Sequence, residues 1–427
     1  MIVLKNKGNV EKKIIKNNYK LKKVKTEKIK AFKEECKNID DSRISKKTTY
    51  KIWDIITVTF LAILADCNDW EEIQQFAELK YDWLRSFLLL TGGVPSAVTY
   101  ERVMAIIDPK QLEKLMVYFI QNVHKRFTLD KDIISIDGKV DSSSGRKASA
   151  TNEEIKNLNV LNVYSKNHGM CIYSEPIENK TNEIPTVEKI IDYINVKNAI
   201  VTWDALNTQK DNVAKVIENN GDYVVALKGN HELFYKEVGL YFNEDMLNVM
   251  RSGAKGVYSM HYEKSHSSLI KYEYFQTEDI KWFEDLPKWK GLKSFGLVLK
   301  TTECDKEITR VKKDGKKIKK IERVKAIETR YYISSLLCNI YLFSESIRSH
   351  WQVENNLHWH LDYTFKADDN TTLNKQALYN LQIIKKGALA LLSRVKDNYK
   401  TSLKLLRKRI SQNTEKEMGK IFNIKTF

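Results

Sequence analysis

The segment KDIISIDGKV, residues 131–140, decides how the rest of the sequence is interpreted. Three isoleucines within residues 133–136 form a β-branched run bounded by charge and a glycine, which is typical of a short buried strand. We expect this strand to end at Asp137. A carboxylate at a buried strand end needs a partner or a cation, because burying an unpaired charge is costly, and strand ends carry the chemistry of many α/β proteins. The alternative is that Asp137 and Gly138 form only a turn.

The composition favours a folded protein with a polyanionic partner. The chain has 427 residues, enough for two or three domains, and its 42% hydrophobic content supports a sizeable core. Lys and Arg number 72 against 55 Asp and Glu, giving a formal net charge of +17. Neutralised phosphates supply most non-specific nucleic-acid affinity, so nucleic acid is the expected partner. A lysine-rich composition without a specific partner is the alternative.

The cysteines and the apolar stretches bear on the compartment. The 5 cysteines are scattered and form no C-x-x-C pair, so neither a disulfide framework nor a zinc ribbon is indicated. A reducing cytoplasm fits best. The longest apolar stretch, residues 55–65, is too short to span a bilayer, so we expect no membrane insertion.

The N-terminal third divides into an arm and a helical domain. Residues 1–47 are rich in Lys and predict a basic arm that lies along phosphates or remains a solvated tail. Residues 48–128 carry apolar residues at helical spacings, with helix starts at Asp69, after Ser96 and at Pro109. We interpret this part as a helical DNA-binding domain. Its candidate DNA contacts are Thr99, Tyr100 and Arg102.

The middle of the chain predicts a mixed α/β sheet. Two strands, residues 158–164 and 170–173, follow the first one, and a short buried strand at 199–202 leads to a second strand-end carboxylate, Asp204. A helix and a further strand at 222–227 come next, which implies parallel pairing.

The rest of the chain alternates β-rich and helical character. Residues 235–327 are β-rich and include a basic hairpin with an Asp-Gly turn at 314–315, and residues 328–336 form a strand that returns to the core. A helix capped by Ser344 then carries Glu354 on the same face as its apolar residues, where a carboxylate needs a partner. Residues 374–406 are helical by pattern. The basic stretch at 401–427 predicts a tail, either solvated or in contact with phosphates.

Two strand-end aspartates followed by a helix-borne glutamate are what a two-metal phosphoryl-transfer site requires, since Mg²⁺ prefers oxygen ligands and two such ions clamp the attacking and leaving oxygens. At this point the sequence resembles DDE insertion-sequence transposases of the H-repeat-associated type, which have a ribonuclease-H-like catalytic core. The strings that carry the resemblance are VPSAVTYERVMAIIDP at 94–109, IDGK at 136–139, TNEIP at 181–185, TWDALNTQK at 202–210, DYVVALKGN at 222–230, RYYISSL at 330–336 and RSHWQVENNLHWHLDYTF at 348–365.

The resemblance implies the catalytic residues, the cofactor and the partners. It implies that Asp137, Asp204 and Glu354 bind two Mg²⁺ ions, with Mn²⁺ able to substitute, and that they cleave and join double-stranded DNA. It also implies a ribonuclease-H-like core at 129–234 and 328–400, interrupted by the β-rich insertion. It further implies that the DNA partners are the terminal repeats of the element and the target, that a homodimer forms on DNA, and that the DNA-bound protein is associated with the bacterial nucleoid.

Further DNA contacts are expected near these acids. Lys139 and Lys228, each close behind a strand, are candidates for phosphate contact. The wider group of transposases often has an Arg four residues before its Glu and a Lys seven after, and this sequence departs from that pattern with His350 and Leu361. We take Arg348 and Trp351 as the substitutes.

Three alternatives remain open at the level of sequence. His350, Glu354 and His358 lie at four-residue steps and could bind one zinc ion, which would leave both aspartates without a role. A transposon-derived DNA-binding protein whose catalysis has decayed is the second, although all three acids are present. In the third, Glu354 only pairs with Arg348 or a histidine, and the aspartates only cap turns.

Overall fold

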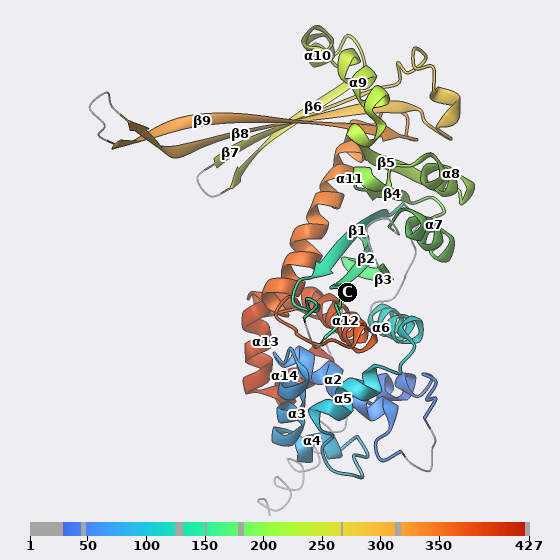
Figure 1. Ribbon diagram of the computed structural model, residues 1–427, viewed down its shortest axis with the longest axis vertical. Helices are drawn as coiled ribbons and strands as arrows, with labels where there is room; N and C mark the ends of the chain where they lie inside the picture. Colours follow the sequence, from blue (N-terminus) through green and yellow to red (C-terminus); the bar gives the residue numbers. More distant parts are fainter. Residues whose placement is uncertain are drawn as a thin grey trace, which may run out of the picture.

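The computed structural model describes residues 29–43, 48–123, 131–149, 152–177, 183–265, 268–311 and 317–422 (Figure 1). Most of the expected N-terminal arm and the Asp-Gly turn at 314–315 lie outside these residues. None of the helices in these ranges is long and apolar enough to cross a membrane.

One mixed sheet contains strands of both the expected core and the insertion, with the strand order β3-β2-β1-β4-β5-β9-β8-β7-β6. β1 (Ile133–Asp141) pairs antiparallel with β2 (Leu158–Ser165), which pairs antiparallel with β3 (Met170–Ile177). On its other side β1 is parallel to β4 (Ile200–Trp203), and β4 is parallel to β5 (Asp222–Leu227). This is the ribonuclease-H-like arrangement that we expected.

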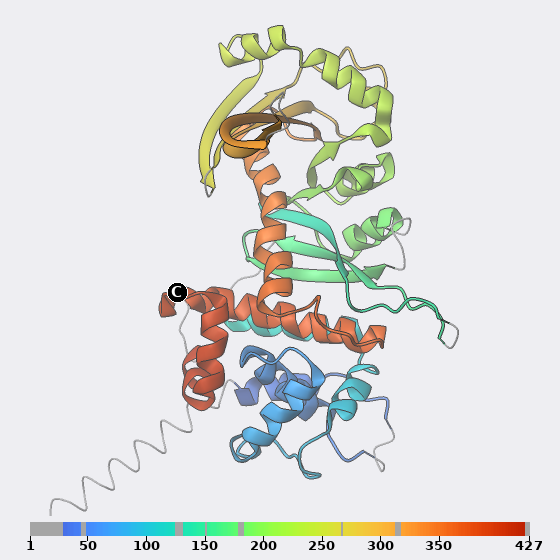
Figure 2. The ribbon, with the colours of Figure 1, turned by 60° about the vertical axis from the view of Figure 1, so that its left-hand side comes forward.

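Helices cover both faces of this sheet. α7 (Glu183–Tyr193) and α8 (Lys210–Glu218) lie on one side, and α11 (Ile340–Val353) lies on the other against β1, β4 and β5 (Figures 1 and 2). The start of α11 differs from the prediction. Its cap is Asn339, whose side chain accepts the Leu342 N–H, and Ser344 lies inside the helix. Both residue types cap well, so the local pattern did not distinguish them.

The insertion adds two helices and four strands, and it is continuous with the core sheet. Its elements are α9 (Glu232–Tyr241), α10 (Glu244–Arg251), β6 (Val257–Ser265), β7 (Ser268–Thr277), β8 (Ser294–Val311) and β9 (Lys317–Ser334). β8 and β9 form a long ribbon that projects from the body (Figure 1). The last part of β9 pairs with β5, so the boundary expected after residue 327 falls inside a single strand.

The N-terminal helical part forms as predicted. Its helices are α2 (Ile52–Leu64), α3 (Trp70–Leu79), α4 (Tyr81–Arg85), α5 (Ala97–Met104) and α6 (Pro109–Val123). Asp69 and Ser96 cap α3 and α5 through their side chains. The helical turns at residues 29–36 extend this part, because Phe32 packs 4.8 Å from Phe60 and 4.7 Å from Phe119, measured between ring centroids. The last part of the expected arm therefore belongs to the core.

The C-terminal residues form helices rather than the expected tail. α12 (Lys375–Tyr399) contacts α2, α5, α6 and β3, so it belongs to both the helical part and the catalytic core. α13 (Leu403–Gln412) and α14 (Thr414–Ile421) follow it, and their apolar residues are buried. The basic cluster at 404–409 concealed this amphipathic pattern.

Arg407 of α13 is wholly buried and joins three parts of the chain. Its guanidinium donates to the backbone carbonyls of Ile63 and Cys67 at the end of α2 and to that of Thr364, and it lies over the Phe365 ring. A planar guanidinium with several donors suits such a cluster of carbonyls.

We expect Arg407→Met to lower the free energy of unfolding by about 3–5 kcal/mol, because buried carbonyls and the ion pair with Asp66 lose their partner. Chemical denaturation measures this change. Lys408→Met, at the exposed next position of the same basic cluster, is the control and should change stability little. Equal losses in the two variants would contradict the role of Arg407.

Lys385 in α12 gives a pH-dependent prediction. The side chain is wholly buried, and burial lowers the pKa of its ammonium to about 7 from 10.5. The folded state therefore favours the neutral amine, and charging it costs stability progressively as the pH falls from about 10 to 7. We expect Lys385→Met to stabilise the fold by on the order of 3 kcal/mol at pH 6. The gain should shrink toward pH 10 in thermal unfolding, whereas the exposed Lys416→Met should show no such trend.

Candidate functional site

The centre of the site lies where the pairing of β1 with β4 ends. The parallel pairing of β1 with β4 ends at Ile136 and Trp203, and the residues that follow these two are Asp137 and Asp204. The two aspartates therefore lie at neighbouring positions on the same sheet edge. β1 itself continues to Asp141 in its pairing with β2, so Asp137 marks the end of the parallel pairing and not, as expected, the end of the strand.

Asp137 is held in a carboxylate-rich environment. Burial raises its pKa to about 7, the nearby carboxylates of Glu354, Asp204 and Glu183 add to the increase, and the hydrogen bond from the Gly138 N–H, at 3.0 Å, opposes it. Like charges converging on a half-buried site are unfavourable without a cation. This is the electrostatic environment expected of a divalent metal site.

Glu354 comes to Asp137 from the end of α11. The helix continues beyond Val353 in two wide π-helical segments, Glu354–His358 and His360–Thr364, a geometry often found at functional sites. The side chain of Glu354 is 71% exposed, although the helical periodicity predicted an inward position. A carboxylate at the rim stays hydrated, whereas the inward positions are taken by Leu357 and Leu361.

His358 lies between the two acids. Its Nδ1 is 3.1 Å from Glu354 Oε2 and 3.6 Å from Asp137 Oδ2, and ligand atoms of the three residues lie within 4.8 Å of one another. Asn162, opposite Asp137 in the β1–β2 pairing, places its Nδ2 3.4 Å from His358 Nε2. If Asn162 donates to Nε2, the proton of the neutral ring is on Nδ1 and faces the carboxylates.

Asp204 adjoins this cluster but faces a lysine. Lys228, which follows β5, donates to Asp204 Oδ1 at 3.0 Å, and both side chains are more than half exposed. Burial raises the pKa of Asp204, yet the hydrogen bonds from Lys228 and the Ala205 N–H outweigh it, and the pKa lies below its ordinary value. Asp137 and Asp204 are therefore adjacent acids of opposite pKa shift.

A cavity of about 430 Å³ opens beside Asp204. Trp351 lines it and is packed between Arg330, 5.2 Å from the ring centroid, and the Tyr272 ring, at 5.6 Å. His350 also lines it, and burial lowers the pKa of its imidazole to about 4. Among the described residues, His350 does not join Glu354 and His358 in a cluster of metal-ligating groups, so the helix does not assemble the three-residue zinc site.

The other predicted DNA contacts lie either on α5 or beside the site, at Arg348 and Lys139. Thr99 is half-buried and Arg102 exposed on α5, but Tyr100 is wholly buried in the helical core and cannot reach DNA, because its ring faces inward on the amphipathic helix. Arg348 is engaged with Glu263 and His261 of β6, which ties α11 to the insertion. Lys139 is enclosed by carboxylates, although we expected it to face phosphates.

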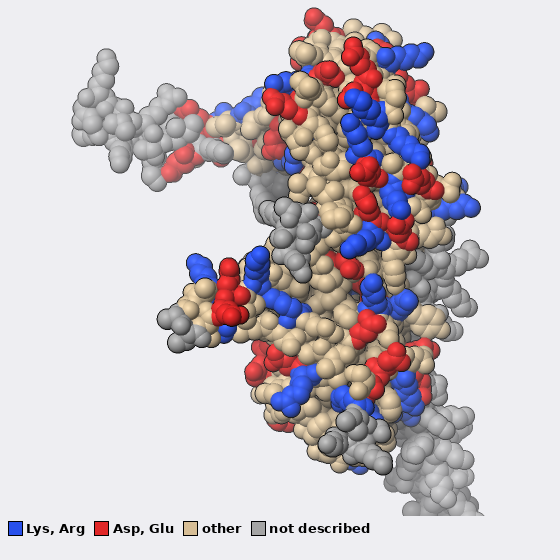
Figure 3. Space-filling view, turned by 45° about the vertical axis from the view of Figure 1, so that its right-hand side comes forward, with Lys and Arg blue, Asp and Glu red and all other residues tan. Residues whose placement is uncertain are grey.

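Charge is mixed on the face of the molecule that Figure 3 shows. On the face seen in Figure 3, basic and acidic side chains alternate and do not separate into one basic patch. The net positive charge of the chain is therefore not concentrated on that face.

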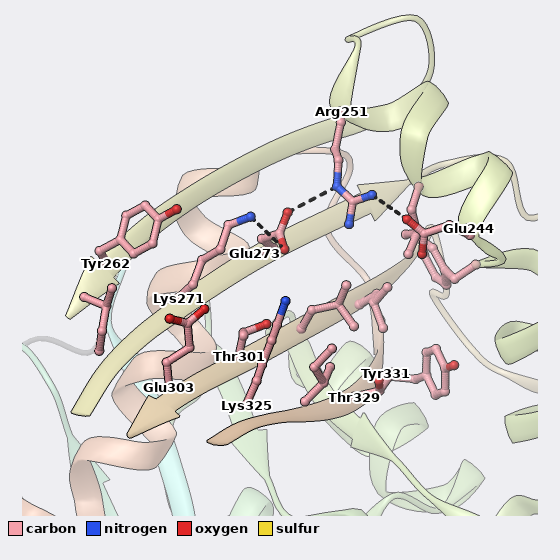
Figure 4. A pocket seen from close by; sticks show the side chains of 16 residues that line it. Glu244, Arg251, Tyr262, Lys271, Glu273, Thr301, Glu303, Lys325, Thr329 and Tyr331 are labelled. Carbon is pink, nitrogen blue, oxygen red and sulfur yellow. Dashed lines mark hydrogen bonds and ion pairs between the residues drawn. The ribbon is translucent and has the colours of Figure 1, made fainter. Parts of the chain in front are cut away.

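A second and larger hollow lies on the insertion. It has a volume of about 640 Å³, and side chains of β6 to β9 project into it together with Arg251 of α10, which pairs with Glu244 and Glu273 (Figure 4). None of the three predicted acids lines it.

Sequence reasoning missed three residues of the site. His358 was considered only as a zinc ligand, and Asn162 and Glu183 were not considered. Glu183 accepts the Asn207 side chain at 2.7 Å and contributes charge beside Asp137. The TNEIP string contained Glu183, but nothing local to Asn162 signals that it lies opposite Asp137.

The sequence matches known families over most of its length. Residues 128–391 match the family described as Transposase DDE domain, and residues 33–120 match the one described as DDE_Tnp_1-associated. The chain belongs to the transposase DDE domain family. Membership implies a transposase role and the use of divalent metal, in keeping with the acidic groups gathered around Asp137.

Relatives of this transposase domain include bacterial proteins. The chain is 29% identical over 377 residues to a putative transposase, YncI, of Escherichia coli O157:H7, covering 88% of this chain and 90% of that one. It is 28% identical over 348 residues to the H repeat-associated putative transposase YhhI of Escherichia coli strain K12, covering 80% and 84%. A solved structure of a piggyBac transposase synaptic complex with hairpin DNA aligns with 90% of this chain and 77% of that chain, at 12% identity and a TM-score of 0.37.

We expect Asn162→Leu to weaken Mn²⁺ binding by roughly 10- to 100-fold, because residues that orient a ligand beside a metal tune its affinity. Isothermal titration calorimetry measures the dissociation constant. Asn159→Leu, three residues earlier on the same strand, is the control and should leave the affinity unchanged. Unaltered binding by Asn162→Leu would show that His358 does not depend on Asn162.

Proposed function

We propose that this transposase cleaves DNA at the ends of its element and joins the freed ends to target DNA, with Asp137, Asp204 and Glu354 as the metal-binding acids. The observation that carries the proposal is that Glu354 lies in one cluster with Asp137, and that Asp204 follows the strand position that neighbours Asp137. β1 supplies Asp137, β4 leads to Asp204, and α11 ends at Glu354. His358 pairs with both Asp137 and Glu354, and a cation-binding site accounts for the further carboxylates of Asp204 and Glu183 that lie near Asp137.

The residues present fit divalent cations. Carboxylate oxygens are the preferred ligands of Mg²⁺ and Mn²⁺. The pKa of Asp137 is raised first by burial and then by the neighbouring carboxylates, and a bound cation would stabilise its ionised form. Two bound Mg²⁺ ions would lower the pKa of water and stabilise the charge that develops on the phosphate oxygens. Asp137 and Glu354 would hold one side of such a site and Asp204 the other, with His358 as an additional nitrogen ligand or as the donor that orients them.

The chain's own residues would bind and orient the DNA strand. Lys228 has an exposed ammonium at the rim of the site, and the cavity beside Asp204 presents Arg330 and Trp351. A guanidinium and an aromatic face suit a phosphate and a base, respectively. Arg102 and Thr99 of the helical part, which matches the transposase-associated family, are our candidates for contact with the terminal repeats.

The proposed reaction has two successive steps at phosphodiester bonds. Water attacks a phosphorus atom at the element end and releases a 3′-hydroxyl. That hydroxyl then attacks a target phosphodiester by the same in-line displacement. Because two ends must be held together, we propose that two copies of the chain assemble on DNA.

Cleavage of DNA carrying the element's own ends, in Mg²⁺, tests the proposal. We expect Asp137→Asn, Asp204→Asn and Glu354→Gln each to reduce strand cleavage about a thousand-fold or more while DNA binding persists. The near-isosteric amides preserve shape, and Asp369→Asn, an exposed acid outside the cluster, should cleave normally. Cleavage that survives one of the three substitutions removes that residue from the site. Binding without cleavage by the wild type would favour the decayed, DNA-binding alternative.

A further inference from the structure

One face of β1 runs along the whole segment that carries Glu354. Because side chains alternate along a strand, Asp137, Lys139 and Asp141 point to the same side. Asp137 meets His358, and Lys139 meets Asp362 and Asp368 further along the chain. Successive residues on this face of β1 therefore contact successive residues of the segment 354–368.

Lys139 makes most of these contacts. Its Nζ lies 2.5 Å from Asp362 Oδ1, 3.3 Å from Asp368 Oδ1 and 3.4 Å from Asp141 Oδ1, and its side chain is only 8% exposed. Ser142, three residues on, adds its backbone N–H and hydroxyl to Asp368. The ammonium thus supplies the positive charge for an acidic cluster that would otherwise need a cation.

Glu354 itself is held much less firmly. Its side chain is largely exposed, and the one ion pair it makes among the described residues is with His358. The inward side of the two π-helical segments packs in the core through Leu357 and Leu361, and His358 contacts Asp137 of β1. The charged contacts eight and fourteen residues further along add a second attachment of this segment to β1.

We propose that Lys139 is a positioning residue: by binding Asp362 and Asp368 it anchors the segment 354–364 on β1 and so fixes Glu354 opposite Asp137 before metal binds. The proposal rests on the proposed function, since it concerns the geometry of that metal site. It assigns Lys139 to the interior of the protein and not to the DNA backbone. The ammonium of Lys139 is enclosed by carboxylates, and moving it to a phosphate would leave the buried Asp141 carboxylate unpaired.

The first test needs no metal and no DNA. In hydrogen exchange of the full chain, we expect Lys139→Met to raise exchange of the amides of residues 354–364 by about ten-fold or more, with protection of α12 retained. Lys139→Arg, which keeps the charge, should restore much of the protection, and Lys147→Met, an exposed lysine of the following loop, should resemble the wild type. If Lys139→Met does not fold, Asp362→Asn serves in its place. Unchanged exchange in a folded variant overturns the proposal.

The second test separates positioning from phosphate contact. We expect Lys139→Met and Asp368→Asn to weaken Mn²⁺ binding roughly 10- to 100-fold, whereas Asp369→Asn binds normally. DNA affinity should keep its dependence on salt. If Mn²⁺ affinity is instead unchanged and the slope of log affinity against log salt falls by about one, Lys139 contacts a phosphate and the proposal is wrong.

The two tests also separate this proposal from the proposed function. If wild-type Mn²⁺ binding does not depend on Asp137, the metal site fails, but hydrogen exchange still decides whether Lys139 holds the segment. If the wild type binds Mn²⁺ through Asp137 and Lys139→Met binds it equally well, the positioning role fails and the metal site stands.

Discussion

The pairing of β1 with β4 is the constraint on which the site depends. Parallel pairing aligns Ile136 with Trp203, so the acids that follow both residues are brought to one edge without any contact between their side chains. β1 can supply this geometry because it is paired on both sides and its isoleucines are buried. A shift of one residue in this register would turn Asp137 to the other face of the sheet. The buried isoleucines therefore fix the face of the sheet on which Asp137 lies.

Charge placed inside the protein organises the surrounding parts. Arg407 joins the end of α2 to Thr364, the last residue of the π-helical segments, and Lys139 joins β1 to Asp362 of the same segment. The segment that carries Glu354 is therefore held at its far end by two buried cations from different elements. Apolar packing would stabilise these contacts without fixing direction, whereas hydrogen-bonded charges have directional partners.

Local patterns predicted most of the elements, and long-range contacts explain the failures. The β-branched runs of β1, β4 and β5 and the caps Asp69 and Ser96 depend only on nearby residues, and these were predicted correctly. The same runs led to Asp137 and Asp204 as candidates, but β1 continues past Asp137, and the resemblance supplied their common role. Burial of Tyr100 and Arg407, enclosure of Lys139 and the approach of Asn162 to His358 depend on partners far along the chain, which periodicity does not reveal. A basic cluster resembles a solvated surface in the sequence, whether or not it becomes buried.

The continuity of β9 connects the insertion to the rim of the site. This strand runs for 18 residues, about 60 Å when extended, from the projecting ribbon to its pairing with β5. β5 ends at Leu227, directly before Lys228 at the rim of the site. One continuous strand therefore connects the projecting ribbon with the strand that precedes Lys228, so the ribbon and the rim of the site belong to the same hydrogen-bonded sheet.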